Sequence, residues 1–151
     1  MRHRQYPEYA QAVTALEPIL SRRDRKIIAI DGPPGSGKTT LGRYLAWHFN
    51  VSLIETDWFL IPGRGRLVYR EDEIAHVIES RRGCPTIVEG VAIRRLMARI
   101  KCPVDYTIFV TCDDLPDSPA LAEDLASYES EFNPRKSADL VLRLQHYLCT
   151  L

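Results

Sequence analysis

Short apolar runs alternate along this chain with segments whose apolar residues recur at helical spacing. Five runs, most of them rich in β-branched residues, predict buried strands. They cover residues 26–31, 51–54, 85–88, 106–110 and 140–144. Apolar residues three and four positions apart predict helices before and between these strands. The helices are expected at residues 9–20, 39–50, 71–80, 93–100 and 120–128.

The regular alternation of strands and helices predicts one parallel sheet with helices on both faces. In such sheets the ligand binds at the carboxyl ends of the strands. The residues that directly follow each strand are therefore the first candidates for a functional site.

Length and charge narrow the classes of function. A chain of 151 residues fits one domain, and its formal net charge of zero gives no general attraction to nucleic acid or to an anionic membrane. No apolar run reaches the roughly 18 residues of a membrane helix, and residues 1–10 lack a secretory apolar core. None of the four cysteines is spaced as C-x-x-C, so we expect free thiols in a reducing cytoplasm. We expect a small-molecule partner, and a monomer or a homodimer.

The turn after the first strand matches the phosphate-loop pattern G-x-x-x-x-G-K-[ST], known as Walker A. The matching residues are Gly32, Pro33, Pro34, Gly35, Ser36, Gly37, Lys38 and Thr39. Glycines let successive backbone N–H groups point at one anion, and the helix that follows adds its positive end. We expect Lys38 to reach the β- and γ-phosphates, Thr39 to bind Mg2+ and Thr40 to assist at the α-phosphate. The pattern predicts binding of ATP or GTP with Mg2+.

Acidic residues follow the second and third strands. Asp57 is placed to accept the proton of an acceptor hydroxyl or to hold Mg2+ through water; the alternative is a solvated loop aspartate. Glu89 ends the third strand and is expected to organise Mg2+ through ordered water. Asp31, directly before Gly32, is expected to support the loop from beneath.

Basic and aromatic residues follow the same strands. Arg64, Arg66 and Arg70 border the expected acceptor pocket, where they would bind an anionic or hydroxylated acceptor; the alternative is a solvated basic loop. Arg94 is expected to face the site and Arg95 to lie at the surface.

Two tryptophans lie near these positions. We expect Trp58 either to stack on a flat acceptor or to serve only structure, and Trp47 and Phe49 to be core or helix-packing residues.

Residues 102–134 contain no lysine or arginine and many acidic residues. Small kinases place an arginine-bearing lid in this region, because phosphoryl transfer develops negative charge that a cation stabilises. Arg135 and Lys136 are the nearest basic residues, and they are expected either to substitute for the lid or to border the adenine ring.

These residues together resemble the uridine kinase-like branch of the P-loop nucleoside and metabolite kinases. Four segments carry the resemblance: 32–40, the 55–59 Asp-x-Phe element, the 86–91 Glu-Gly element and 134–141. The resemblance implies that Asp57 binds the acceptor hydroxyl and that 134–141 lies beside the nucleotide base. The chain departs from the family in its lid, which lacks arginines, and in its shorter region after the second strand.

The prediction is one P-loop kinase-like domain over residues 1–151, with an N-terminal helix within 1–24 and a reduced lid at 111–134. Its fold is a three-layer α/β/α P-loop NTPase fold with a five-stranded parallel sheet, adenylate-kinase-like. The predicted function is transfer of the γ-phosphate of Mg-ATP to a hydroxyl of a nucleoside or small metabolite. The alternative is a nucleotide-binding sensor or degenerate kinase without acceptor-dependent turnover.

Overall fold

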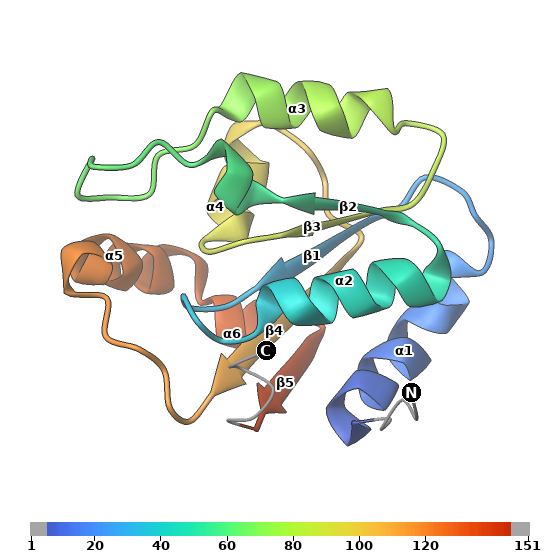
Figure 1. Ribbon diagram of the computed structural model, residues 1–151. Coiled ribbons are helices and arrows are strands. Elements are labelled where there is room, and N and C mark those ends of the chain that lie inside the picture. Colours follow the sequence, from blue (N-terminus) through green and yellow to red (C-terminus); the bar gives the residue numbers. More distant parts are fainter. Residues whose placement is uncertain (1–5, 146–151) are drawn as a thin grey trace.

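The computed structural model describes residues 6–145, and its centre is a sheet of five parallel strands (Figure 1). The strands lie in the order β2-β3-β1-β4-β5. Their bounds are β1 Ile27–Asp31, β2 Ser52–Glu55, β3 Thr86–Glu89, β4 Tyr106–Cys112 and β5 Leu140–Leu144. The predicted fold class and all five predicted strands are confirmed.

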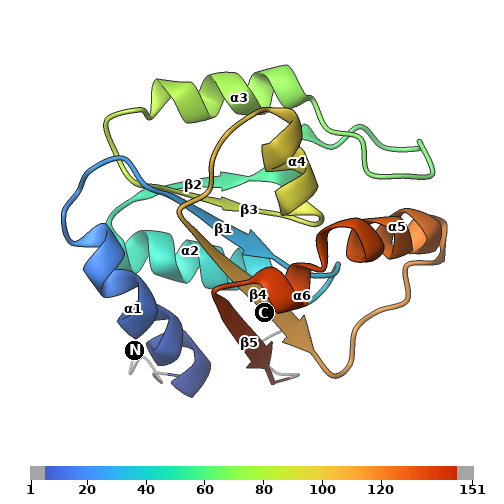
Figure 2. The same cartoon turned by 180° about the vertical axis from the view of Figure 1, so that it is seen from behind.

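Helices cover both faces of this sheet, as Figures 1 and 2 show for α2 and α4. The helices are α1 Pro7–Leu20, α2 Lys38–Phe49, α3 Glu71–Ser80, α4 Ile93–Arg99, α5 Ala122–Phe132 and α6 Pro134–Ser137. Two 3-10 turns, η1 Thr56–Phe59 and η2 Pro119–Leu121, precede α3 and α5. Ile28 and Ile30 pack with α1 and α2, whereas Ile27 and Ala29 pack with α3 and α4. The sheet is therefore buried on both faces, which explains the uninterrupted apolar runs.

The strand register determines where the site lies, because it brings the carboxyl ends of the strands to one edge of the sheet. Glu89 at the end of β3 is the register partner of Ile30 on β1 and of Glu55 on β2. The phosphate loop leaves β1 at this edge, and Asp57 follows β2 there. The three predicted site segments therefore share one edge of the sheet, as the parallel topology requires.

Some local expectations hold only in part. Trp47 is 66% exposed on α2, whereas Phe49 packs against the core as expected. The helix expected at 120–128 starts as a 3-10 turn and continues as α5 to Phe132, where Asn133 ends it with a left-handed backbone (φ 44°). The short helix α6 was not predicted.

The expectation for the thiols holds in part. Cys84 and Cys102 are free, as expected. Cys112 is disulfide-bonded, contrary to expectation, and its partner lies outside the described residues. Within residues 6–145, no helix combines the length and the apolar character needed to cross a bilayer.

Candidate active site

The phosphate loop has the backbone that an anion site needs. Gly35 and Gly37 have φ values of 75° and 92°, a region that side-chain-bearing residues rarely adopt. Gly37 caps the N-terminus of α2 without a side-chain hydrogen bond, so no side chain caps the first N–H groups of the helix. At Gly32 a Cβ would lie 2.2 Å from the carbonyl oxygen of Val110, so only glycine fits where the loop passes β4.

Asp31 supports the loop from beneath, as expected. Its Oδ1 accepts a 2.8 Å hydrogen bond from the backbone N–H of Gly32, and its Oδ2 accepts one from the Tyr128 hydroxyl of α5. Burial raises the pKa of Asp31, against the effect of both hydrogen bonds. Asp31 therefore links the base of the phosphate loop to α5.

Lys38 lies inside the loop. Its side chain is buried, and Nζ donates a 2.7 Å hydrogen bond to the carbonyl oxygen of Pro33. Burial lowers the pKa of Lys38, while the charges of Glu89 and Asp57 oppose that shift. The phosphate loop itself therefore holds the ammonium group in place.

Thr39 and Glu89 meet beside the loop. The Thr39 hydroxyl donates a 3.0 Å hydrogen bond to Oε1 of Glu89, whose side chain is buried. A hydroxyl and a carboxylate are the hard oxygen donors that Mg2+ prefers, so these residues fit the predicted metal role.

Burial raises the pKa of Glu89 to about 7, because the charged carboxylate is poorly solvated. The folded state then binds the proton more tightly than the unfolded state, whose glutamate titrates near 4.5. We expect the free energy of unfolding of the metal-free protein to fall by up to about 3 kcal/mol as pH rises from about 4.5 to about 7. It should then level off above pH 7.

Urea unfolding of the wild type and of Glu89→Gln across this pH range tests the expectation. The variant cannot titrate at this position, so its unfolding free energy should fall less steeply. Identical slopes for the two proteins would show that Glu89 is not the group responsible.

A cavity of about 500 Å3 opens beside the loop. Lys38, Thr39, Thr40 and Asp57 all line it, so the structure brings together the predicted phosphate, metal and acceptor residues. Three leucines from the loop after η1 and from η2 form part of its apolar wall: Leu60, Leu67 and Leu121. Asp57 is exposed within this cavity, where an acceptor hydroxyl can reach it.

The predicted acceptor arginines lie elsewhere. Arg64 and Arg66 are exposed near the tip of the loop after η1, and neither lines the cavity. Arg70 donates a 2.7 Å hydrogen bond to the carbonyl oxygen of Trp58 and pairs with Glu73. Arg70 therefore secures the loop from outside the cavity.

Arg94 and Trp58 also point away from the cavity. Arg94 donates hydrogen bonds to the carbonyl oxygen and the hydroxyl of Ser137 on α6. Trp58 is 73% exposed, and it lines a separate hollow beside β2 together with Val77 of α3. The structure does not bring either residue to Lys38.

Sequence reasoning missed Arg43. This residue lies on α2, one turn after Thr39, and its side chain lines the cavity with Asp57. Its helical spacing from Thr39 was visible in the sequence, but which side of α2 faces the acceptor was not.

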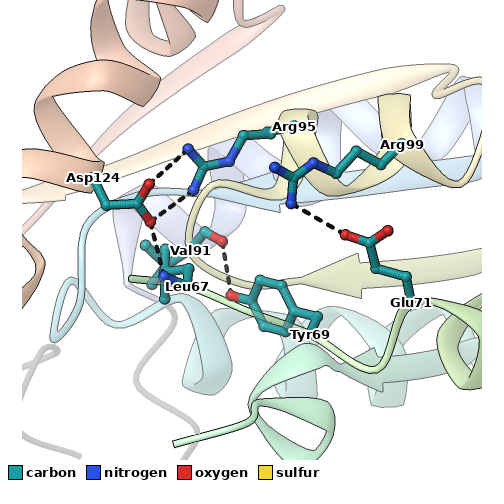
Figure 3. A network of polar contacts seen from close by, with 7 residues as sticks. All are labelled: Leu67, Tyr69, Glu71, Val91, Arg95, Arg99 and Asp124. Carbon is teal, nitrogen blue, oxygen red and sulfur yellow. Dashed lines mark hydrogen bonds and ion pairs between the residues drawn. The ribbon is translucent and has the colours of Figure 1, made fainter. Parts of the chain in front are cut away.

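Arg95 is a second correction, since it was expected at the surface. Its side chain is 13% exposed, and two guanidinium nitrogens donate to Asp124 of α5 at 3.0 and 2.8 Å (Figure 3). Oδ2 of Asp124 also accepts a 2.8 Å hydrogen bond from the backbone N–H of Leu67. Asp124 thus joins α4, α5 and the loop that borders the cavity.

We expect Asp124→Ala to lower the free energy of unfolding by about 3 kcal/mol, because Arg95 would keep a largely buried charge without its partner. Glu71→Ala provides the matched control. It breaks the pair with Arg99, whose side chain is 51% exposed, and should cost about 1 kcal/mol or less. Urea unfolding measures both, and equal losses would contradict a special role for Asp124.

A second cavity, of about 290 Å3, lies at the start of the phosphate loop. Gly32 and Pro33 of the phosphate loop, Tyr128 of α5 and Arg135 of α6 contribute to its lining. Lys136 is exposed and does not line it. Of the two predicted basic residues, only Arg135 therefore lines this cavity.

The fold is similar to those of solved small-molecule kinases. The model aligns with a possible uridine kinase from Bacillus stearothermophilus with a TM-score of 0.64 and 16% identity, over 89% of this chain and 97% of that one. It also aligns with a shikimate kinase from Acinetobacter baumannii with a TM-score of 0.53 and 14% identity, over 85% and 89% of the two chains. The chain has the P-loop kinase fold.

Similarity in sequence is more local. A curated shikimate kinase from Corynebacterium diphtheriae is 53% identical over 47 residues. That match spans 31% of this chain and only 27% of the relative's length. No protein-family model matches the chain. The proteins of this P-loop kinase fold that it resembles are small-molecule kinases with different acceptors, so the comparisons leave the acceptor undetermined.

Proposed function

We propose that this chain is an ATP-dependent phosphotransferase that moves the γ-phosphate of Mg-ATP to a hydroxyl of a small molecule. The observation that carries the proposal is that Asp57, Lys38 and Thr39 line one and the same cavity. A carboxylate beside a phosphate loop gives an acceptor hydroxyl both a base and a position for attack.

Each residue has a defined part in this proposal. Asp57 accepts the proton of the attacking hydroxyl. Lys38 stabilises the negative charge that develops on the transferring phosphoryl group, and the N-terminus of α2 holds the other phosphates. Thr39 and Glu89 would hold Mg2+, which neutralises phosphate charge when bound.

The nucleotide base is proposed to occupy the second cavity. Its lining is largely apolar and includes Phe109, Tyr128 and Pro134, which suits a flat ring. Arg135 lines the same cavity and is proposed to border the base. For Lys136, which does not line the cavity, a role beside the base or in place of the lid stays a prediction from the sequence.

Consumption of Mg-ATP by the purified chain tests the proposal against a panel of nucleosides, sugar acids and small alcohols. We expect turnover that requires one class of acceptor. Tight nucleotide binding without turnover on any acceptor would contradict the phosphotransferase.

One observation favours a second function. The predicted lid region, residues 111–134, contains no lysine or arginine that could reach the transferring phosphate, and Pro116 packs against the phosphate loop at Gly35. A nucleotide sensor needs no such cation. The sensor predicts nucleotide affinity that is independent of every acceptor tested.

A further inference from the structure

The acceptor cavity contains one guanidinium. Among the described residues that line it, Lys38 and Arg43 are the only basic ones, and Lys38 is enclosed by the phosphate loop. The arginines that follow β2 and β3 in the sequence do not line this cavity. Any cation that meets the acceptor inside the cavity therefore comes from α2.

The guanidinium of Arg43 is oriented by Glu55. Nε donates to Oε1 at 2.6 Å and Nη2 donates to Oε2 at 2.9 Å, a two-pronged pair. The indole N–H of Trp58 donates to the same Oε2 at 2.9 Å, which fixes the carboxylate in turn. The hydrogen bond from Arg43 lowers the pKa of Glu55, so the pair stays ionised near neutral pH.

Although it is paired with Glu55, Arg43 remains accessible to a ligand. Its side chain remains 62% exposed, and the bonds to Glu55 use only Nε and Nη2. A planar guanidinium has five N–H donors, so Nη1 is available to a second oxygen ligand. An ion pair as exposed as this one contributes little stability, and a ligand can share it or rearrange it at small cost.

We infer that Arg43 determines acceptor specificity by binding a carboxylate of the acceptor, which makes the acceptor a small hydroxy acid. This inference rests on the proposed phosphotransferase and names its substrate class. Glu55 already compensates part of the charge of Arg43, which suits a singly charged carboxylate better than a doubly charged phosphate. Glu55 is a positioning residue, because it acts through Arg43.

Charge also gives the acceptor one orientation. Asp57 repels a carboxylate but accepts a hydrogen bond from a hydroxyl, whereas Arg43 attracts the carboxylate. The acceptor therefore presents its hydroxyl to Asp57 and its carboxylate to Arg43. The leucine side chains of the wall contact the carbon skeleton between these groups.

Calorimetric binding in the presence of Mg-ADP tests the inference without requiring turnover. The probes are pairs that differ in the carboxylate: D-gluconate and D-glucitol, D-glycerate and glycerol, shikimate and its methyl ester. We expect the wild type to bind the carboxylate of at least one pair about tenfold more tightly or better than the neutral member. Arg43→Met should lose that preference, Arg43→Lys should keep part of it, and Mg-ADP affinity should not change.

Arg82→Met is the matched control, because Arg82 is an exposed arginine that pairs with Glu79 at the opposite edge of the sheet. It should retain the full preference. Equal binding within every pair, a preference retained in Arg43→Met, or no binding of any carboxylate would overturn the inference.

Turnover assays on the same panel separate the two proposals. Carboxylate binding without phosphorylation would contradict only the proposed phosphotransferase activity. Phosphorylation of neutral acceptors as readily as carboxylates would contradict only the proposed role of Arg43.

Discussion

Lys38→Ala is expected to lower turnover by about a thousandfold or more while the protein stays folded. Lys38 is buried in the phosphate loop, where its Nζ donates a hydrogen bond to the carbonyl oxygen of Pro33. Removing one preorganised group that stabilises transition-state charge costs about a hundred- to a thousandfold, and a lysine contributes a full charge. Steady-state assays of the wild type and the variant measure the effect.

The fold should tolerate this change, because burial disfavours the charged ammonium and alanine removes that cost. Circular dichroism and the urea midpoint check this point. Lys101→Ala, at an exposed lysine just after α4, provides the control and should keep wild-type turnover. A Lys38→Ala variant with full turnover would show that the site is assigned to the wrong loop.

Asp57→Asn is expected to reduce phosphoryl transfer by about a hundred- to ten-thousandfold, since an amide cannot accept the hydroxyl proton. Mg-ATP affinity should remain unchanged, because the proposed phosphate ligands lie in the loop and in α2. Turnover at saturating acceptor and calorimetric ATP binding separate the two effects.

Asp72→Asn on the exposed side of α3 is the control for the same chemical change. It should leave both quantities unaltered. Weakened ATP affinity with unchanged turnover in Asp57→Asn would show that Asp57 serves the metal or the nucleotide instead of the acceptor.

Backbone architecture was predictable because it depends on local patterns. Buried parallel strands require apolar runs, and the phosphate loop needs glycines at fixed spacing between a strand and a helix. Helix α3 and strand β5 form over the predicted residues, Glu71–Ser80 and Leu140–Leu144. Helix α6 spans only Pro134–Ser137, which is too short to show a periodic pattern.

Side-chain partners were less predictable because they are set by contacts between distant segments. Arg95 and Asp124 are 29 positions apart, and nothing in either local sequence indicates that α5 packs beside α4. Arg43 was missed for a similar reason, since helical spacing cannot tell which face of α2 borders the acceptor cavity. Trp47 was expected in the core or in helix packing from its residue type, but its position on α2 leaves it largely exposed.

Phosphorus NMR of the products tests whether this chain transfers a phosphoryl group to a small-molecule hydroxyl. The wild-type chain, Mg-ATP and the pooled acceptor panel would be incubated beside the Lys38→Ala variant. In the wild type alone, we expect a new phosphomonoester resonance that grows as the γ-phosphate resonance of ATP declines. Decline of ATP to inorganic phosphate without a phosphomonoester, or no decline at all, would contradict the proposed phosphoryl transfer.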